Sequence, residues 1–345
     1  MTYDIIVLGS GPAGLAAAIA ARGRDKSVLV IGNRWQDSPL AKAERVDNYP
    51  GLPGRTGLEL LEEFYRHAQE AGAEFVTGKA LSLLGWNGFS LTVGSQVYQG
   101  KALILAPGVV RAAKYPGEAE YLGRGVSYCA TCDGMLYRNR PVVVVGKSAH
   151  APEEAVYLQG LGCRVSYAAA RRPEELPPDI PFIKAGRLEI VGEGQVRALR
   201  ADGEEVPCDG VFILRPTMAL TDLLPGLETE DGRIVVDRSM ATSIPGVFAA
   251  GDCTGLSGVW PDAMAQGKAA AWNMAGVEEV YEKPYPFKNT SNFFGVTMLS
   301  AGRLDLTEGA DVLVHKTAGE YKKAVITDGK LTGYLSLGDI SNEGL

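Results

Sequence analysis

Two cysteines, Cys129 and Cys132, are the residues of this sequence best suited to carry out chemistry. They stand in the segment CATCDG, where Ala130 and Thr131 separate the thiols. This spacing lets a disulfide close and commonly brings the pKa of one thiol toward neutrality, which favours thiol–disulfide exchange. Asp133 follows directly and is placed to exchange a proton with a departing thiolate. The motif therefore predicts a redox-active cysteine pair.

Half of a zinc site and a pair of buried thiols are the alternative interpretations of this motif. A structural zinc site needs about two further ligands at matching spacing. The remaining cysteines and histidines are scattered singly, as His67, His150, His315, Cys163, Cys208 and Cys253. We therefore favour redox chemistry and expect no metal here.

A glycine-rich turn near the N-terminus predicts a dinucleotide site. The segment GSGPAG places Gly9, Gly11 and Gly14 between an apolar run, residues 4–8, and an alanine-rich run. The first glycine permits a tight turn, the second lets the backbone approach a pyrophosphate, and the third lets a helix pack closely on a strand. An acidic residue usually follows the second strand of such a unit, but here Asn33 stands in its place.

A second part of the same site is expected much later in the chain. Gly251 and Asp252 follow a short apolar run and precede an amphipathic segment, residues 263–275. One interpretation of Asp252 is a helix cap. Together with the N-terminal turn, we favour a carboxylate that reaches the sugar chain of the dinucleotide, which would make the first domain discontinuous.

The segment PVVVVGKSAHAPEEAVYL repeats the strand–turn–helix opening with most of its glycines replaced. Gly146 keeps the first glycine position, but Ser148 occupies the second, and its Cβ projects toward the place of a pyrophosphate. Lys147 lies between them, and Arg171 and Arg172 follow the next apolar run. This pattern predicts a nucleotide-type site that has changed its ligand.

Apolar, β-branched runs that alternate with helix-like segments must position these residues. Such alternation predicts parallel sheets with crossover helices and therefore an α/β fold. We expect two Rossmann-like dinucleotide-binding domains, the second inserted in the first, and a small α+β C-terminal extension. The expected bounds are 1–113 with 241–283, then 114–240, and 284–345 for the extension. In the extension, Asp328 and Gly329 predict a hairpin turn.

Composition limits the partners of the chain. Its 345 residues carry a formal net charge of -7 with a pI near 5.2, which argues against nucleic acid as a partner. The one long uncharged run contains the glycines of GSGPAG, so we expect a strand, turn and helix there instead of a membrane segment. Cysteine usage suits a reducing compartment, and we expect a cytoplasmic protein.

Five segments in the same order resemble the low-molecular-weight thioredoxin reductases: GSGPAG, VDNYPG, LAPG, CATCDG and FAAGD. The resemblance runs from about residue 3 to residue 280. It implies FAD in the first domain, Cys132 facing the flavin, Cys129 attacking the disulfide of a partner, and Asp133 as acid/base. The candidate FAD contacts are Gly9, Gly11, Pro12, Ala13, Gly14, Asn33, Asn48, Ala106, Gly108, Gly251 and Asp252.

The resemblance further implies a thioredoxin-like protein disulfide as substrate and a homodimer. That family binds NADPH at the turn where this chain has Gly146, Lys147 and Ser148. Three interpretations stay open: a tolerant NADPH site, an altered site whose electrons come from reduced ferredoxin or a second flavin, and a purely structural domain. We favour the second over an ordinary NADPH-dependent reductase, while a non-enzymatic flavin and disulfide sensor is the contrasting hypothesis. The segment after Pro284 resembles the C-terminal domain of NADH-dependent rubredoxin- and nitrite-reductase-type flavoproteins.

Overall fold

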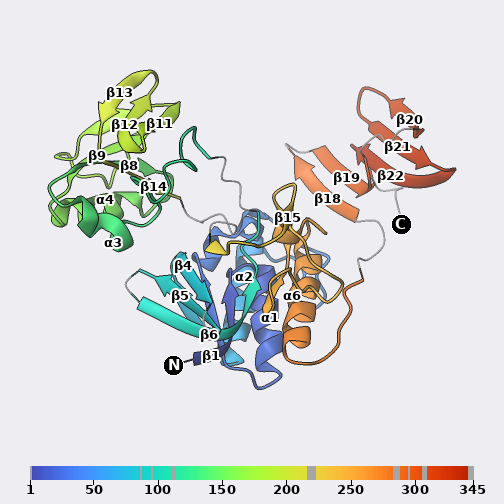
Figure 1. Cartoon of the computed structure of the whole chain (residues 1–345). Helices are drawn as coiled ribbons and strands as arrows, with labels where there is room; N and C mark the ends of the chain where they lie inside the picture. The colour runs from blue at the N-terminus through green and yellow to red at the C-terminus, as the bar shows by residue number, and fades with distance from the viewer. Residues whose placement is uncertain are drawn as a thin grey trace. The chain divides into compact units, whose positions relative to one another are not determined.

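The computed structural model divides the chain into two compact units, Met1–Tyr281 and Glu282–Leu345 (Figure 1). It describes residues 2–85, 88–94, 96–109, 114–215, 223–282, 288–293, 296–304 and 309–340. Among these, no helix is long and apolar enough to cross a membrane. The finer division of the first unit into two domains remains a prediction.

The first sheet forms from the apolar runs at the N-terminus and from one run far along the chain. Its strands are β1 (Thr2–Leu8), β2 (Val28–Gly32), β3 (Glu74–Thr77), β4 (Ala80–Gly85), β5 (Phe89–Val93), β6 (Gln96–Leu105) and β17 (Val247–Ala249). They lie in the order β3-β2-β1-β6-β5-β4, and β17 pairs with β6. The pairs β1–β2, β2–β3, β1–β6 and β6–β17 are parallel, so these strands end at one edge of the sheet.

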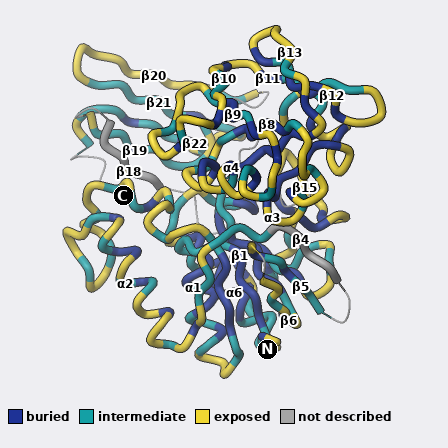
Figure 2. The backbone as a smooth tube through the Cα atoms, turned by 90° about the vertical axis from the view of Figure 1, so that its left-hand side faces the viewer, coloured by how far each residue is buried: buried dark blue, intermediate teal, exposed yellow. Residues whose placement is uncertain are grey.

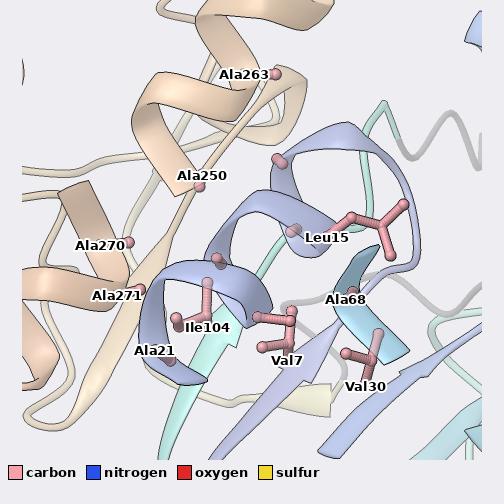
Figure 3. Close-up of a cluster of buried hydrophobic side chains, with 14 of the residues drawn as sticks. Val7, Leu15, Ala21, Val30, Ala68, Ile104, Ala250, Ala263, Ala270 and Ala271 are labelled. Atoms are coloured by element: carbon pink, nitrogen blue, oxygen red, sulfur yellow. The ribbon is translucent and has the colours of Figure 1, made fainter. Parts of the chain in front are cut away.

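Three helices belong with this sheet: α1 (Pro12–Arg22), α2 (Gly57–Glu70) and α6 (Trp260–Met274). Small side chains let α1 and α6 approach closely, since a Cβ at Gly267 would lie 2.1 Å from the carbonyl oxygen of Ala13. Figure 3 shows α1 over the strands that carry Val7, Val30 and Ile104. Close packing fixes the start of α1 relative to the strand ends.

The second sheet is parallel throughout and carries the cysteine motif. Its order is β10 (Phe182–Lys184), β9 (Arg164–Ala169), β8 (Pro141–Gly146), β14 (Gly210–Leu214) and β7 (Val126–Ser127). The valines of β8, residues 142–145, are at most 1% exposed, as expected for a central parallel strand (Figure 2). The short helix α3 (Ala130–Asp133) follows β7, and α4 (Ala151–Gly160) follows β8.

Smaller elements complete the first unit. An antiparallel sheet contains β11 (Leu188–Glu193), β12 (Gln195–Ala201) and β13 (Glu204–Pro207), and β15 (Thr229–Glu230) pairs with β16 (Arg233–Ile234). Single-turn helices are η1 (Trp35–Asp37), η2 (Pro39–Lys42), η3 (Gly134–Tyr137) and η4 (Asp252–Thr254). The predicted α/β fold with two Rossmann-like sheets is confirmed.

The C-terminal unit is an antiparallel sheet. Its order is β18 (Lys288–Phe293), β19 (Val296–Gly302), β22 (Lys330–Leu337), β21 (Tyr321–Thr327) and β20 (Asp311–Lys316). Asp328 and Gly329 join β21 to β22 with φ angles of 53° and 70°, so the predicted hairpin turn is confirmed, and two positive φ angles are those of a type I′ turn. The edge strand β20 is exposed along its length (Figure 2).

Candidate functional site

Cys129 and Cys132 form a disulfide at the start of α3. Cys129 is the residue before the helix, and its sulfur accepts a hydrogen bond from the backbone N–H of Cys132 at 3.0 Å. Cys129 is only 6% exposed, whereas Cys132 is exposed. In this arrangement, attack by Cys129 on another protein requires that its sulfur first become accessible.

A buried serine connects the disulfide to the neighbouring carboxylate. The Ser127 hydroxyl donates to Asp133 Oδ2 at 2.7 Å and accepts from the backbone N–H of Cys129 at 3.1 Å. Ser127 is 3% exposed, so this geometry is held within the protein. Sequence reasoning predicted Asp133 but missed Ser127, because no spacing rule identifies a hydroxyl at that position.

The three glycines of the N-terminal turn have different surroundings. Gly9 and Gly14 pack against the backbone, whereas Gly11 has open space beside it. A Cβ at Gly9 would lie 2.1 Å from the Ala106 carbonyl oxygen, and one at Gly14 would lie 1.9 Å from the Gly9 carbonyl oxygen. A Cβ at Gly11 would meet only Ser38 Oγ, at 3.7 Å. The open space at Gly11 lies at the N-terminus of α1, where backbone amides favour an anion. These residues fit the pyrophosphate of a dinucleotide.

The first turn of α1 also leaves its amides available. Gly11 precedes the helix with no side-chain cap, Pro12 occupies the first turn, and no acidic residue is present there. An acidic side chain in this turn would itself complement the positive end of the helix dipole. Its absence suits the binding of a phosphate group.

Predicted residues from three distant segments meet at one edge of the first sheet. The Ala106 N–H donates to the Leu8 carbonyl at 2.7 Å, which places the end of β6 beside the end of β1. The Ala250 N–H donates to the Leu105 carbonyl at 2.9 Å, which adds the end of β17. A Cβ at Gly251 would lie 2.9 Å from that of Ala13, so this turn touches the first turn of α1.

A fully buried glutamine holds the turn that carries Asp252. Gln266 Oε1 accepts from the Gly251 N–H at 2.9 Å and from the Thr254 hydroxyl at 3.0 Å. Burial raises the pKa of Asp252, and the charge of Arg233 partly offsets this. Sequence reasoning did not identify Gln266, although its place within α6 could have suggested a buried polar contact.

The other predicted FAD contacts lie in loops. The Ser10 hydroxyl donates to the backbone carbonyl of Asn33 at 2.5 Å, and the Asn33 side chain is exposed. Asn48 is also exposed, in a loop whose neighbour Tyr49 packs 4.8 Å from Trp260 between ring centroids. Gly108 has a φ of 72° and open space beside it. Their contact with FAD stays a prediction.

The second glycine turn is shaped by side-chain packing. A Cβ at Gly146 would lie 1.7 Å from the hydroxyl oxygen of Tyr167, which projects from β9. Tyr167 is 1% exposed, and burial raises its pKa to about 12. The following turn closes on itself, since the Ala151 N–H donates to the Ser148 carbonyl at 3.2 Å. The packing of Tyr167 is therefore enough to explain why position 146 is a glycine, and a bound nucleotide is not needed for that explanation.

Lys147 lies beside a fixed cluster of charged and aromatic groups. Its Nζ is 5.6 Å from the ring centroid of Tyr115, and the guanidinium of Arg215 is 5.3 Å from the same centroid. Arg215 binds both carboxylate oxygens of Glu118, at 2.6 and 2.8 Å, and Glu118 also accepts from the Tyr128 hydroxyl at 2.9 Å. Glu118 is 0% exposed, so the cluster is rigidly held.

The two arginines after β9 have different surroundings. Arg172 donates to the carbonyl of Pro177 at 2.6 Å and lies near those of Leu176 and Ile180, and its guanidinium is 5.7 Å from the Phe182 ring centroid. These contacts close the loop before β10. Arg171 is exposed. The structure therefore gives Arg172 a local role that the sequence did not predict.

The described residues contain no group of three or more His, Cys, Asp or Glu side chains that could hold a metal ion. The three remaining thiols, Cys163, Cys208 and Cys253, are free and buried. Burial raises the pKa of Cys208 and of Cys253 to about 12, which makes these two thiols unreactive.

Two protein-family models match the chain. One, described as pyridine nucleotide-disulphide oxidoreductase, covers residues 3–185 and 179–267. The other, described as the rubredoxin NAD+ reductase C-terminal domain, covers residues 288–343. The second match agrees with the resemblance predicted for the segment after Pro284.

Known relatives and solved structures agree with the first match. A thioredoxin reductase of Aquifex aeolicus (strain VF5) is 36% identical over 274 residues, which are 72% of this chain and 85% of that protein. A ferredoxin-flavin thioredoxin reductase from Clostridium acetobutylicum matches with a TM-score of 0.71 at 39% identity, covering 80% of this chain and 97% of that one. A thioredoxin reductase from Gloeobacter violaceus matches with a TM-score of 0.69 at 33% identity, covering 81% and 96%.

The fold and the cysteine site define a flavin-dependent disulfide oxidoreductase. The chain belongs to the low-molecular-weight thioredoxin reductase family, within the pyridine nucleotide-disulphide oxidoreductases. It is an enzyme, as predicted, and membership implies FAD as its cofactor. The open space at Gly11 fits that cofactor.

Proposed function

We propose that this enzyme takes electrons from a donor other than NADPH and passes them through FAD and the Cys129–Cys132 pair to a thioredoxin-like protein disulfide. The observation that carries the proposal is the altered turn after β8. There Gly146 packs against Tyr167, and Ser148 replaces the glycine that would let a pyrophosphate approach the backbone.

The expected loss of NADPH affinity is large. Hydrogen bonds from backbone amides to a charged phosphate each contribute ~1.5–3 kcal/mol. Losing two of them weakens binding by on the order of a hundredfold or more, at tenfold per ~1.4 kcal/mol. Arg172, a candidate for recognising the phosphate of NADPH, already binds the carbonyls of its own loop. These features favour a donor that does not need this turn.

Reduced ferredoxin is the donor we favour, and a second flavin nucleotide beside Lys147 is the alternative. The name of the similar Clostridium acetobutylicum enzyme, a ferredoxin-flavin thioredoxin reductase, supports the first. The cationic group of Lys147, which lies over Tyr115 beside the Arg215–Glu118 ion pair, supports an anionic nucleotide near the end of β8. Counting flavins per chain separates the two cases.

Each protein group then has a defined part in the reaction. The Gly11 turn would hold the FAD, which, once reduced by the donor, would supply the two electrons that break the Cys129–Cys132 disulfide. Cys132 is the proposed sulfur on the flavin side, and Cys129 forms the mixed disulfide with the partner after it becomes accessible. Asp133, oriented by Ser127, is placed to give a proton to the departing thiolate.

Turnover with defined reductants tests this function. The purified protein is assayed anaerobically with oxidised thioredoxin and NADPH, NADH or reduced ferredoxin, and its flavin content is measured. Thioredoxin reduction with reduced ferredoxin, but not with NADPH or NADH, supports the proposal. Equal turnover with micromolar NADPH overturns it. Flavin content without any thioredoxin reduction would support a redox sensor instead. A homodimer and a cytoplasmic location remain predictions from the sequence.

A further inference from the structure

The strand β20 forms an open edge of the C-terminal sheet. All six of its residues pair with β21, and no strand among the described residues pairs with its other side. Successive side chains of a strand point to opposite faces, and every side chain of β20 is exposed (Figure 2). The outer side of an edge strand presents backbone N–H and C=O groups that can pair with a strand of another chain.

Three adjacent apolar side chains lie at the centre of this edge. Val312, Leu313 and Val314 are 37%, 61% and 55% exposed. Edge strands are commonly protected by a proline, a lysine or a β-bulge. β20 contains no proline, its pairing with β21 has no register shift, and its single lysine, Lys316, is the last residue. The centre of the edge is therefore regular, apolar and open to a further strand.

The sequence of β20 complements itself when two copies run antiparallel about Leu313. A two-fold axis through that residue places Leu313 opposite its own copy and Val312 opposite Val314. The same axis places Asp311 opposite His315 at each end. A carboxylate accepts a hydrogen bond from an imidazole N–H in either form of the ring. Apolar side chains thus meet in the middle of the pair, and complementary polar side chains meet at both ends.

Neighbouring registers of the same pairing are less favourable. An axis through Val314 sets Leu313 against His315. An axis through Val312 sets Asp311 against Leu313. Each of these arrangements places a polar or charged side chain opposite an apolar one, whereas the axis through Leu313 does not. The pattern of side chains therefore selects one register.

We propose that β20 is an interaction surface for a second copy of this chain, with two β20 strands paired antiparallel about Leu313 so that two C-terminal sheets join into one. Each copy contributes the same strand, so the contact is isologous. The homodimer implied by the family resemblance rests on residues 3–280, whereas β20 belongs to the other compact unit. The contact is therefore a separate one, and it does not depend on the electron donor or on the disulfide substrate.

Cysteine substitution at the two-fold axis tests the proposal. In Leu313→Cys the two introduced side chains face each other, with Cβ atoms about 4.5–5.5 Å apart, close to the span of a disulfide. Val314→Cys is the matched control: Val314 is comparably exposed, but its own copy is displaced by two residues, about 7 Å along the strand. Leu331→Cys, at a residue of β22 that is 63% exposed, measures random collision.

The full-length wild type and the three variants are oxidised with copper phenanthroline without reductant, and covalent dimers are measured on non-reducing gels. We expect Leu313→Cys to form them on the order of tenfold or more faster than the two control variants, because paired strands raise the effective concentration of the sulfurs. The wild type should form none. Equal rates for Leu313→Cys and Leu331→Cys would overturn the proposal, and so would a faster reaction of Val314→Cys.

Exchanging the end charges gives a second readout that identifies the partner strand. In the Leu313→Cys background, Asp311→Lys and His315→Glu each remove a favourable pair at both ends of the contact. Each cross-strand pair contributes ~0.2–1 kcal/mol and occurs twice, so each change should slow cross-linking about fivefold. The double variant sets a lysine opposite a glutamate and should restore the rate.

A double variant as slow as the single variants would overturn the pairing about Leu313. Cross-linking requires neither an electron donor nor thioredoxin. Such a failure would therefore leave the proposed function intact.

Discussion

The hydroxyl oxygen of Tyr167 occupies the space where a side chain at Gly146 would begin, 1.7 Å from the position of its Cβ. Packing alone therefore requires glycine at the last position of β8. In the sequence, the same residue matches the first glycine of the turn that resembles a nucleotide-binding site. A glycine kept for this reason does not indicate that the turn still binds a dinucleotide.

Gly146→Ala should lower stability by about 1–3 kcal/mol, the usual cost of inserting a methyl group into a filled core. The measurement is the free energy of unfolding in denaturant. In the background of Tyr167→Leu the same substitution should cost less, which a double-mutant cycle detects. Equal losses of stability in both backgrounds would show that Tyr167 is not the reason why position 146 requires glycine.

Gly11→Val should give a folded protein that lacks bound FAD. A Cβ there meets only Ser38 Oγ at 3.7 Å, so the added side chain fills the space for the pyrophosphate without disturbing the fold. Flavin absorbance and circular dichroism measure the two properties. Gly14→Ala is the control, because its Cβ would lie 1.9 Å from the Gly9 carbonyl oxygen and should destabilise the fold itself. Full FAD content in Gly11→Val would refute the assignment.

Cys132→Ser should trap a mixed disulfide with thioredoxin through Cys129, because the sulfur that resolves it is absent. Cys129→Ser should abolish turnover and leave Cys132 as a free thiolate beside the flavin, visible as a long-wavelength absorbance band while the flavin is oxidised. Mass spectrometry detects the mixed disulfide, and absorbance spectroscopy detects the long-wavelength band. If the two variants exchange behaviours, the assigned roles of the cysteines are reversed.

Arg172→Ala should lower the melting temperature, because its guanidinium donates to the Pro177 carbonyl and lies over the Phe182 ring. The expected loss is about 1 kcal/mol, from one hydrogen bond and one cation–aromatic contact, both at an exposed side chain. Arg171→Ala, which changes an exposed neighbour, should leave the melting temperature unchanged. Equal melting temperatures for the two variants would contradict the local role of Arg172.

The sequence predicted those parts of the molecule that depend on local pattern. Runs of β-branched and other apolar residues predicted β1, β8 and β14, because a central parallel strand is apolar on both faces. The glycines of the first turn and the cysteine pair were likewise identified, because both motifs need particular residues at fixed spacing.

Long-range contacts were beyond sequence reasoning. Glu118 and Arg215 form a buried ion pair although 97 positions separate them. Tyr167 reaches Gly146 from the neighbouring strand, and Gln266 reaches the Gly251 amide from α6. Only the pairing of strands and helices brings such residues together, so no pattern within one segment indicates them.

Rapid mixing of the oxidised protein with NADPH tests the central claim most directly. Flavin absorbance is followed anaerobically after mixing with 1 mM NADPH (about a typical upper KM) and, separately, with reduced ferredoxin. The altered turn at Gly146 and Ser148 predicts slow or absent reduction by NADPH and rapid reduction by ferredoxin. Rapid reduction by micromolar NADPH would contradict the account and assign this enzyme to the ordinary NADPH-dependent thioredoxin reductases.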